Sequence, residues 1–225
     1  MLIRLSHSSM QQQRVNLLLV SAPWASPMRP SIQLGVLKSY TERHFSADLV
    51  QVRVVPAHLG ILVQSAGGDF PALYCAAESL GEAFYQLLFY RAFGHPGLQF
   101  DERLYNEAIE ELATPSLDAL TISQYLDRLD LGTIDYVKRR IIPRLSRHRH
   151  NIIGLTLNFN QVYASLYICE LIKAHSSECH IDFVLGGHSV SIPRVRKEIR
   201  ELALDVYYCL GEGEICLLYT SPSPR

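Results

Sequence analysis

The chain has 225 residues, of which 48% are hydrophobic, and its formal net charge at pH 7 is -1. This length and hydrophobic content are enough for one well-buried core. The near-neutral charge gives no support for a nucleic-acid partner or an anionic membrane surface. No apolar run approaches the roughly 20 residues of a membrane span, and the run 15–20 is too short and too far into the chain for a signal peptide. We therefore expect a cytoplasmic protein that contacts neither nucleic acid nor membrane.

The N-terminal quarter of the chain predicts one β-strand, helix and strand unit. Residues 1–13 are polar and rich in Ser and Gln, which is typical of a loose tail. The apolar run 15–20 predicts a first buried strand, and the prolines of 21–30 disfavour a helix after it. Ser31 is placed to cap a helix that follows, and the alternation over 48–55 predicts the second strand.

Between residues 56 and 132 the alternation of strands and helices stops. The segments 74–93, 101–112 and 117–129 have helical spacing and are separated by turns rich in Gly and Pro. We interpret 56–132 as a helical insertion between the second and third strands that forms a cap over a crevice. A further helix, 134–149, returns the chain to the sheet.

The alternation resumes after residue 150. Strands are predicted at 151–158, 180–185 and 205–210, with helices from 162 to 175 and from about 192. Strands that alternate with helices imply right-handed crossovers and a parallel sheet covered on both faces. The predicted fold is a doubly wound α/β domain, flavodoxin-like or Rossmann-like, with five parallel strands in the order 2-1-3-4-5.

In such a sheet, ligands bind beyond the carboxyl ends of the strands. Paired glycines let a backbone come close to a bulky ligand, and Thr, Asn and Gln offer hydrogen bonds without charge. The predicted site therefore suits a large, mostly neutral ligand. Its candidate residues are Ser21, Pro23, Thr156, Asn158, Phe159, Asn160, Gln161, Ser165, Gly186, Gly187, His188 and Gly211.

Several of these residues also have purely structural explanations. The glycines 186–187 can form a tight turn, and the amides within 158–161 can cap the helix that follows them. A single loop histidine such as His188 is more often solvated or hydrogen-bonded than bound to a metal. The basic run 138–150 is typical of a solvated helix face, and we predict no catalytic residue and no metal ligand.

Four segments carry a resemblance to a known family: PSIQLGVLK at 30–38, GLTLNFNQVYASL at 154–166, VLGG at 184–187 and GEGE at 211–214. In this order they resemble the N-terminal cobalamin-binding (B12-binding) domain of B12-dependent radical SAM enzymes. The resemblance covers 14–215 and is strongest to the group that matures ribosomally made peptides. It implies that the Thr156 and Asn158 loop and the glycines 186–187 wrap the nucleotide tail of cobalamin, and that Gln161 approaches the corrin.

The resemblance also implies what the intact enzyme does. Such an enzyme passes a methyl group from methylcobalamin to an unactivated carbon of a peptide substrate, or performs a related radical modification. The chain has no Asp-x-His-x-x-Gly segment, so cobalamin is expected to bind without a histidine below the cobalt. It also has no CxxxCxxC motif, so the iron–sulfur cluster and S-adenosylmethionine belong to a radical SAM domain expected beyond it, and this chain alone is not catalytic.

The remaining cysteines and the C-terminal tail point to no further site. The five cysteines are scattered without zinc or CxxC spacing, which is typical of reduced thiols. The tail CLLYTSPSPR at 216–225 resembles a translated sequencing adapter, and we interpret the native reading as ending near Ile215. A genuine disordered tail is the alternative, given its Ser and Pro content.

Three other functions fit the same fold class. A stand-alone regulatory B12-binding module is the first alternative. The second is a flavodoxin-like flavin- or nucleotide-binding domain, but the chain lacks a Gly-rich phosphate loop after Val20, and its prolines remove backbone N–H groups. A receiver-like regulatory domain needs an acidic cluster beyond the first strand, and 21–23 supplies none.

Overall fold

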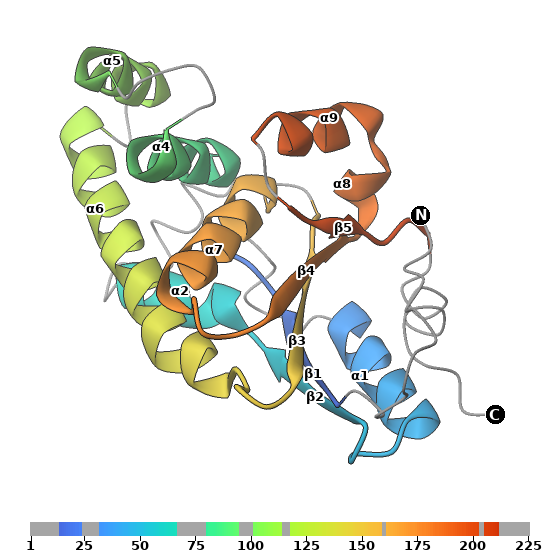
Figure 1. The fold of residues 1–225 in the computed structure, drawn as a ribbon. Coiled ribbons are helices and arrows are strands. Elements are labelled where there is room, and N and C mark those ends of the chain that lie inside the picture. Colours follow the sequence, from blue (N-terminus) through green and yellow to red (C-terminus); the bar gives the residue numbers. More distant parts are fainter. Residues whose placement is uncertain are drawn as a thin grey trace.

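The protein contains a five-stranded parallel sheet with the strand order β2-β1-β3-β4-β5 (Figure 1). The computed structural model describes residues 14–23, 32–66, 80–94, 101–113, 118–158, 161–202 and 205–211. The strands are β1 (Val15–Val20), β2 (Val50–Val55), β3 (His150–Thr156), β4 (Ile181–Gly186) and β5 (Tyr207–Tyr208). The order and the parallel pairing confirm the predicted doubly wound α/β fold.

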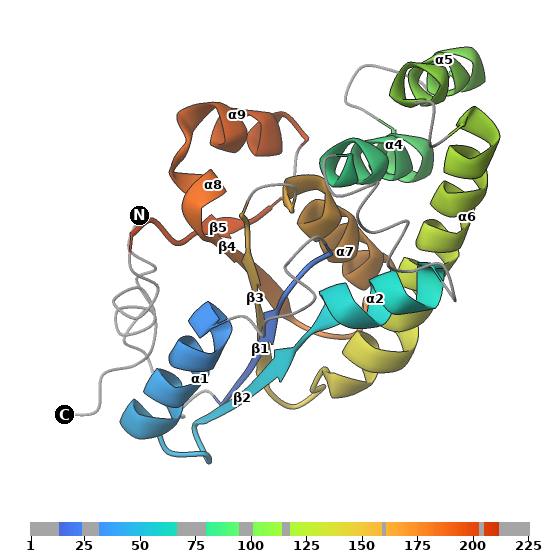
Figure 2. The ribbon, with the colours of Figure 1, turned by 180° about the vertical axis from the view of Figure 1, so that it is seen from behind.

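Helices cover both faces of this sheet (Figures 1 and 2). They are α1 (Ile32–His44), α2 (Ala57–Ala66), α4 (Gly81–Phe93), α5 (Glu102–Leu112), α6 (Ala119–Tyr136), α7 (Val162–His175), α8 (His188–Ser191) and α9 (Pro193–Glu201). Helix α6 continues into a π-helical turn, Val137–Ile141, and a 3-10 turn, Ile142–Arg144. The separate helices expected at 117–129 and 134–149 are therefore one nearly continuous element, and this part of the prediction was wrong.

Strands β1, β2 and β3 divide their side chains between two apolar clusters, one on each face of the sheet. In β1, Leu17 and Leu19 pack with Leu34 of α1, whereas Leu18 and Val20 pack into the larger cluster on the other face. Successive side chains of a strand point to opposite faces, so β1 has to be apolar along nearly its whole length. This is why the uninterrupted apolar run 15–20 was a reliable strand signal.

The insertion between β2 and β3 begins with a helix that the sequence analysis did not find. Helix α2 lies against α6, and the two backbones approach closely at Gly60 and Gly132. A Cβ at Gly60 would lie 2.2 Å from the Tyr136 ring, and one at Gly132 would lie 2.6 Å from Ser65 Oγ. A mid-helix glycine weakens a helical pattern, yet here it permits the packing. Helices α2 and α6 contribute to the cluster on the sheet face, so this part of the expected cap is a covering layer.

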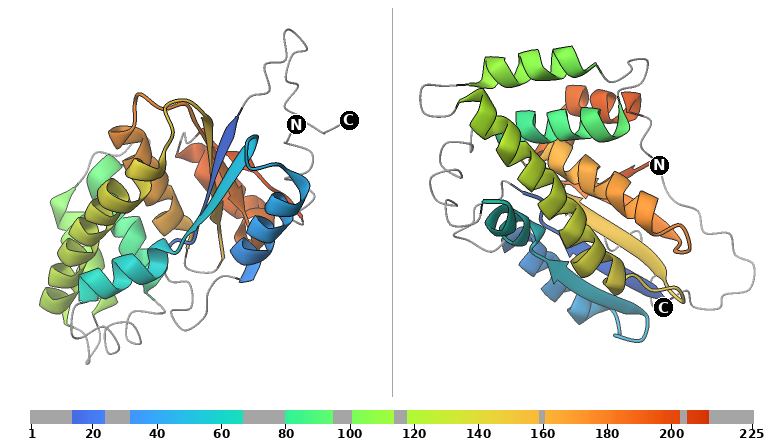
Figure 3. Two further views of the ribbon diagram at one scale, coloured as in Figure 1. Left: turned by 90° about the horizontal axis from the view of Figure 1, so that it is seen from below. Right: turned by 90° about the vertical axis from the view of Figure 1, so that its left-hand side faces the viewer.

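Helix α4 forms an outer layer beside α7 (Figure 3). Arg91 of α4 holds α6 through ion pairs of 2.8 Å to Asp127 and to Asp130. Tyr85 joins the same helices through a 2.9 Å hydrogen bond between its hydroxyl and that of Thr133. The insertion is thus tied to both the sheet layer and α7.

A buried amide pair joins the two central strands at their amino-terminal ends. Asn16 of β1 and Asn151 of β3 are 1% and 0% exposed, and Asn16 Nδ2 donates to Asn151 Oδ1 over 2.8 Å. Asn151 Oδ1 also accepts from Ser146 N, and its Nδ2 donates to Ser146 O and to His180 O. One side chain therefore holds the loop that enters β3 and the start of β4.

Replacement of this amide should destabilise the whole fold. Asn151→Ala removes the partner of both Ser146 backbone groups and one partner each of the Asn16 amide and the His180 carbonyl, so we expect a loss of about 3 kcal/mol of unfolding free energy. Urea unfolding followed by circular dichroism measures it. The control is Asn106→Ala on the exposed side of α5, which should stay within about 0.5 kcal/mol of wild type. Equal effects of the two substitutions would contradict the assigned role.

Candidate ligand-binding site

The carboxyl ends of β1, β3 and β4 form one edge of the sheet, as the sequence predicted. Val20 pairs with Leu155, and Thr156 pairs with Gly186, so the loops that leave these strands start at neighbouring positions. Helix α1 covers one face of the sheet while α7 covers the other (Figure 2). The edge between β1 and β3 is therefore the topological switch point, where doubly wound domains bind their ligands.

Gln161 connects the loops that follow β1 and β3. Its side chain is 1% exposed, and its Nε2 donates to Ala22 O over 2.8 Å. Its Oε1 accepts from Asn158 N over 3.3 Å. Its side chain makes no capping bond to α7, so the alternative reading of Gln161 as a side-chain cap is not supported. The buried Gln161 side chain therefore holds the loop after β1 against the loop after β3.

Gly187 brings the loop after β4 against the loop after β3. Its backbone has φ 99° and ψ 179°, and a Cβ there would lie 2.8 Å from Leu157 O. Leu157 N donates to Gly186 O over 2.6 Å, and Ser189 N donates to Leu157 O over 3.0 Å. This backbone conformation is nearly confined to glycine. Gly187 is therefore required for the contact between two loops of the site.

Gly187→Ala should disrupt this contact. We expect a loss of about 3 kcal/mol in unfolding free energy, because the substitution combines backbone strain with a collision at Leu157 O. Gly211→Ala is the matched control, since Gly211 has φ 94° but a Cβ there meets nothing within 4 Å. Strain alone should cost that variant about 1 kcal/mol. Denaturant unfolding of both proteins checks the difference, and a milder effect at Gly187 than at Gly211 would contradict it.

Three buried polar atoms around this edge have no hydrogen-bond partner in the described part of the chain: Ser21 Oγ, His58 Nδ1 and Ser165 Oγ. Their residues are 1%, 3% and 0% exposed. Ser21 and His58 are adjacent, because His58 N donates to Ser21 O over 2.8 Å. Ser165 lies one turn after Gln161 on α7 and donates its backbone N–H to Gln161 O. Unsatisfied buried polar atoms are uncommon in folded proteins, and all three of these are uncharged.

His58 is a site residue that the sequence analysis missed. It follows the carboxyl end of β2, and burial lowers the pKa of its imidazole, so the ring is neutral at pH 7. The available signal was its position just after a predicted strand, in the sequence Pro56-Ala57-His58. His58 lies in the first turn of α2, and because this helix was not predicted, the residue was not considered.

Glu82 of α4 is a second residue that was missed, and it occupies the N-terminus of α7. Its Oε2 accepts from Val162 N over 3.1 Å, and its Oε1 accepts from Tyr163 N over 3.0 Å. Free N–H groups at a helix N-terminus attract phosphates, but here a carboxylate already binds them and would repel a second anion. Glu198 of α9 adds another carboxylate, which accepts from Tyr163 Oη over 2.6 Å. This end of α7 therefore disfavours a phosphate ligand.

The half-buried position of Glu82 predicts a pH dependence of stability. Burial raises the pKa of Glu82 above its ordinary value of 4.5, the two backbone hydrogen bonds lower it, and the Glu198 charge raises it. As pH rises from 4.5, the carboxyl of the unfolded chain ionises first, so ionisation favours unfolding. The unfolding free energy of Glu82→Gln minus that of wild type should therefore increase between pH 4.5 and about pH 7. Urea unfolding at intermediate pH values measures it, and a difference that falls with pH would contradict it.

The other predicted site residues are placed as follows. Pro23 and Thr156 are buried, Asn158 is half-buried, and His188 is exposed in the short helix α8. Gly211 is exposed beyond β5. The candidates Phe159 and Asn160, the cap Ser31 and the tails at 1–13 and 216–225 lie outside the described residues. Three of the cysteines lie inside them, at positions 169, 179 and 209, and Cys169 and Cys209 are buried.

The chain matches none of the family models, curated proteins or solved structures with which it was compared. Its class therefore follows from the fold: a doubly wound α/β domain with uncharged, unsatisfied polar atoms buried near the switch point. Within the described ranges, no helix is long and apolar enough to cross a membrane.

Proposed function

We propose that the carboxyl edge of β1, β3 and β4 binds cobalamin, without a histidine ligand below the cobalt. The observation that carries the proposal is the set of buried, uncharged and unpaired polar atoms at the switch point, Ser21 Oγ, His58 Nδ1 and Ser165 Oγ. A corrin is a large ring rimmed by neutral amides, which need hydrogen-bond partners without opposite charge. The segments 154–166 and 184–187, which carry the family resemblance, both contribute to this edge.

In this proposal the residues of the chain bind and orient the cofactor. Ser21 and Ser165 would donate or accept hydrogen bonds at the amide rim, and Gln161 would hold the two loops at the correct separation. The bound cobalamin would supply a transferable methyl group. A radical SAM domain in the same polypeptide would carry the iron–sulfur cluster and S-adenosylmethionine, and a ribosomally made peptide would be the substrate of the intact enzyme.

Titration with hydroxocobalamin tests the proposal. We expect the corrin absorption bands to shift on binding, and equilibrium dialysis should give a stoichiometry of about one per chain. Ser165→Ala should keep the fold, because the hydroxyl has no partner in the described structure, and should weaken cobalamin binding about 3- to 10-fold, the value of one hydrogen bond. Ser176→Ala at the opposite end of α7 is the control and should leave the affinity unchanged. No spectral change at high micromolar cobalamin would contradict the proposal.

A flavin- or nucleotide-binding domain is the second candidate, since flavodoxin-like domains share this strand order. The Glu82 carboxylate argues only against a phosphate placed at the N-terminus of α7, because it already binds the N–H groups there. Flavin mononucleotide added in the same dialysis experiment discriminates the two. Binding of the flavin in preference to cobalamin would favour this second function.

A further inference from the structure

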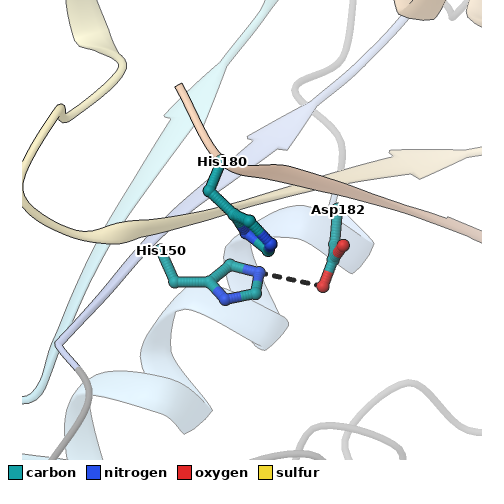
Figure 4. Close-up of side chains that lie close together, drawn as sticks. All are labelled: His150, His180 and Asp182. Carbon is teal, nitrogen blue, oxygen red and sulfur yellow. Dashed lines mark hydrogen bonds and ion pairs between the residues drawn. The ribbon is translucent and has the colours of Figure 1, made fainter. Parts of the chain in front are cut away.

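We propose a second site, for a divalent transition-metal ion such as Zn²⁺, formed by His150, His180 and Asp182 at the amino-terminal ends of β3 and β4 (Figure 4). It lies at the end of the sheet opposite to the proposed cobalamin edge. Its three side chains play no part in that site, so the proposal is independent of the cofactor assignment.

The register of the sheet brings the three side chains together. Asn151 pairs with Ile181, so His150 and His180, one residue earlier on each chain segment, lie next to each other. Asp182 follows His180 by two residues and so points to the same face of β4. The neighbouring Ile153 and Phe183 pack into the larger apolar cluster, so His150 and Asp182 project from the other face of the sheet.

The distances suit a shared ion. His150 Nε2 and Asp182 Oδ2 are 2.8 Å apart, and the imidazole rings of His150 and His180 have centroids 4.3 Å apart. One ligand atom from each of the three residues lies within 4.8 Å of the others. A tetrahedral zinc ion with bonds of about 2.0 Å separates its ligands by roughly 3.3 Å. Small side-chain rotations therefore bring all three atoms to bonding distance.

The types of donor select the class of metal. Two imidazoles and one carboxylate match zinc and similar first-row ions, whereas Mg²⁺ and Ca²⁺ prefer oxygen ligands alone. The side chains of His150 and Asp182 are 15% and 27% exposed, and His180 is exposed. An ion can therefore enter from solvent, and a water molecule can complete its coordination.

Hydrogen bonds to their backbone groups position the two histidine residues before any ion binds. Asn151 Nδ2 donates to His180 O over 3.1 Å, and His150 N donates to Arg14 O over 3.0 Å. The nearby Arg147 is paired with Glu178 at 2.9 Å, which offsets its charge. A bound ion would then join the first residues of β3 and β4 and reinforce the contact that Asn151 already makes.

Zinc titration of the full chain tests this site. We expect one Zn²⁺ per chain with a micromolar or lower Kd, a visible Co²⁺ spectrum typical of low coordination number, and a rise in Tm of about 5 °C at saturating Zn²⁺. His180→Ala should weaken Zn²⁺ binding at least about 10-fold. Because His180 is exposed, this variant should keep the metal-free Tm of wild type.

Two control variants make the result specific. His148→Ala removes an exposed histidine from the same loop, and Cys179→Ser removes the thiol next to His180; both should bind Zn²⁺ as wild type does. Unchanged affinity in His180→Ala, or loss of binding in Cys179→Ser, would overturn the proposal, as would the absence of binding at about 100 μM Zn²⁺. His180→Ala should bind hydroxocobalamin as wild type does, so failure at one site is distinguishable from failure at the other.

Discussion

The hydrogen bond between Asn16 and Asn151 is the constraint on which the rest of the structure depends. It joins β1 to β3, two strands that are adjacent in the sheet although the whole helical insertion separates them in the chain. The Asn151 amide makes hydrogen bonds to three separate segments, so a slip of either strand would leave several buried polar groups without partners. The pair therefore fixes the register of β1 against β3, and with it the position of every loop at the carboxyl edge.

That register gives the two ends of the sheet different chemistry. At the carboxyl edge, Gln161 and Gly187 draw the loops together around uncharged polar atoms. At the amino edge, the same pairing of β3 with β4 places two imidazoles and a carboxylate side by side. One end thus carries uncharged polar atoms and the other two imidazoles and a carboxylate, and the core lies between them.

The insertion contributes a charged side chain to the carboxyl edge of the sheet. Helix α4 lies beside α7, and its Glu82 carboxylate accepts hydrogen bonds from the first N–H groups of α7. A phosphate would otherwise bind these N–H groups. The carboxylate has to be buried to do this, and burial raises its pKa. The helical insertion between β2 and β3 therefore contributes a side chain to the candidate site.

The sequence by itself determined the parallel sheet and its strand order, and with them which loops lie together at its carboxyl edge. Strand 15–20 and helix 162–175 were predicted with the bounds that the structure has, because apolar period and turn residues are local signals. Helix α2, the single helix α6, His58, Glu82 and the cluster of His150, His180 and Asp182 were decided by the tertiary structure alone. Each depends on a contact between segments distant in the chain, such as Gly60 against Tyr136, and no local pattern encodes such a contact.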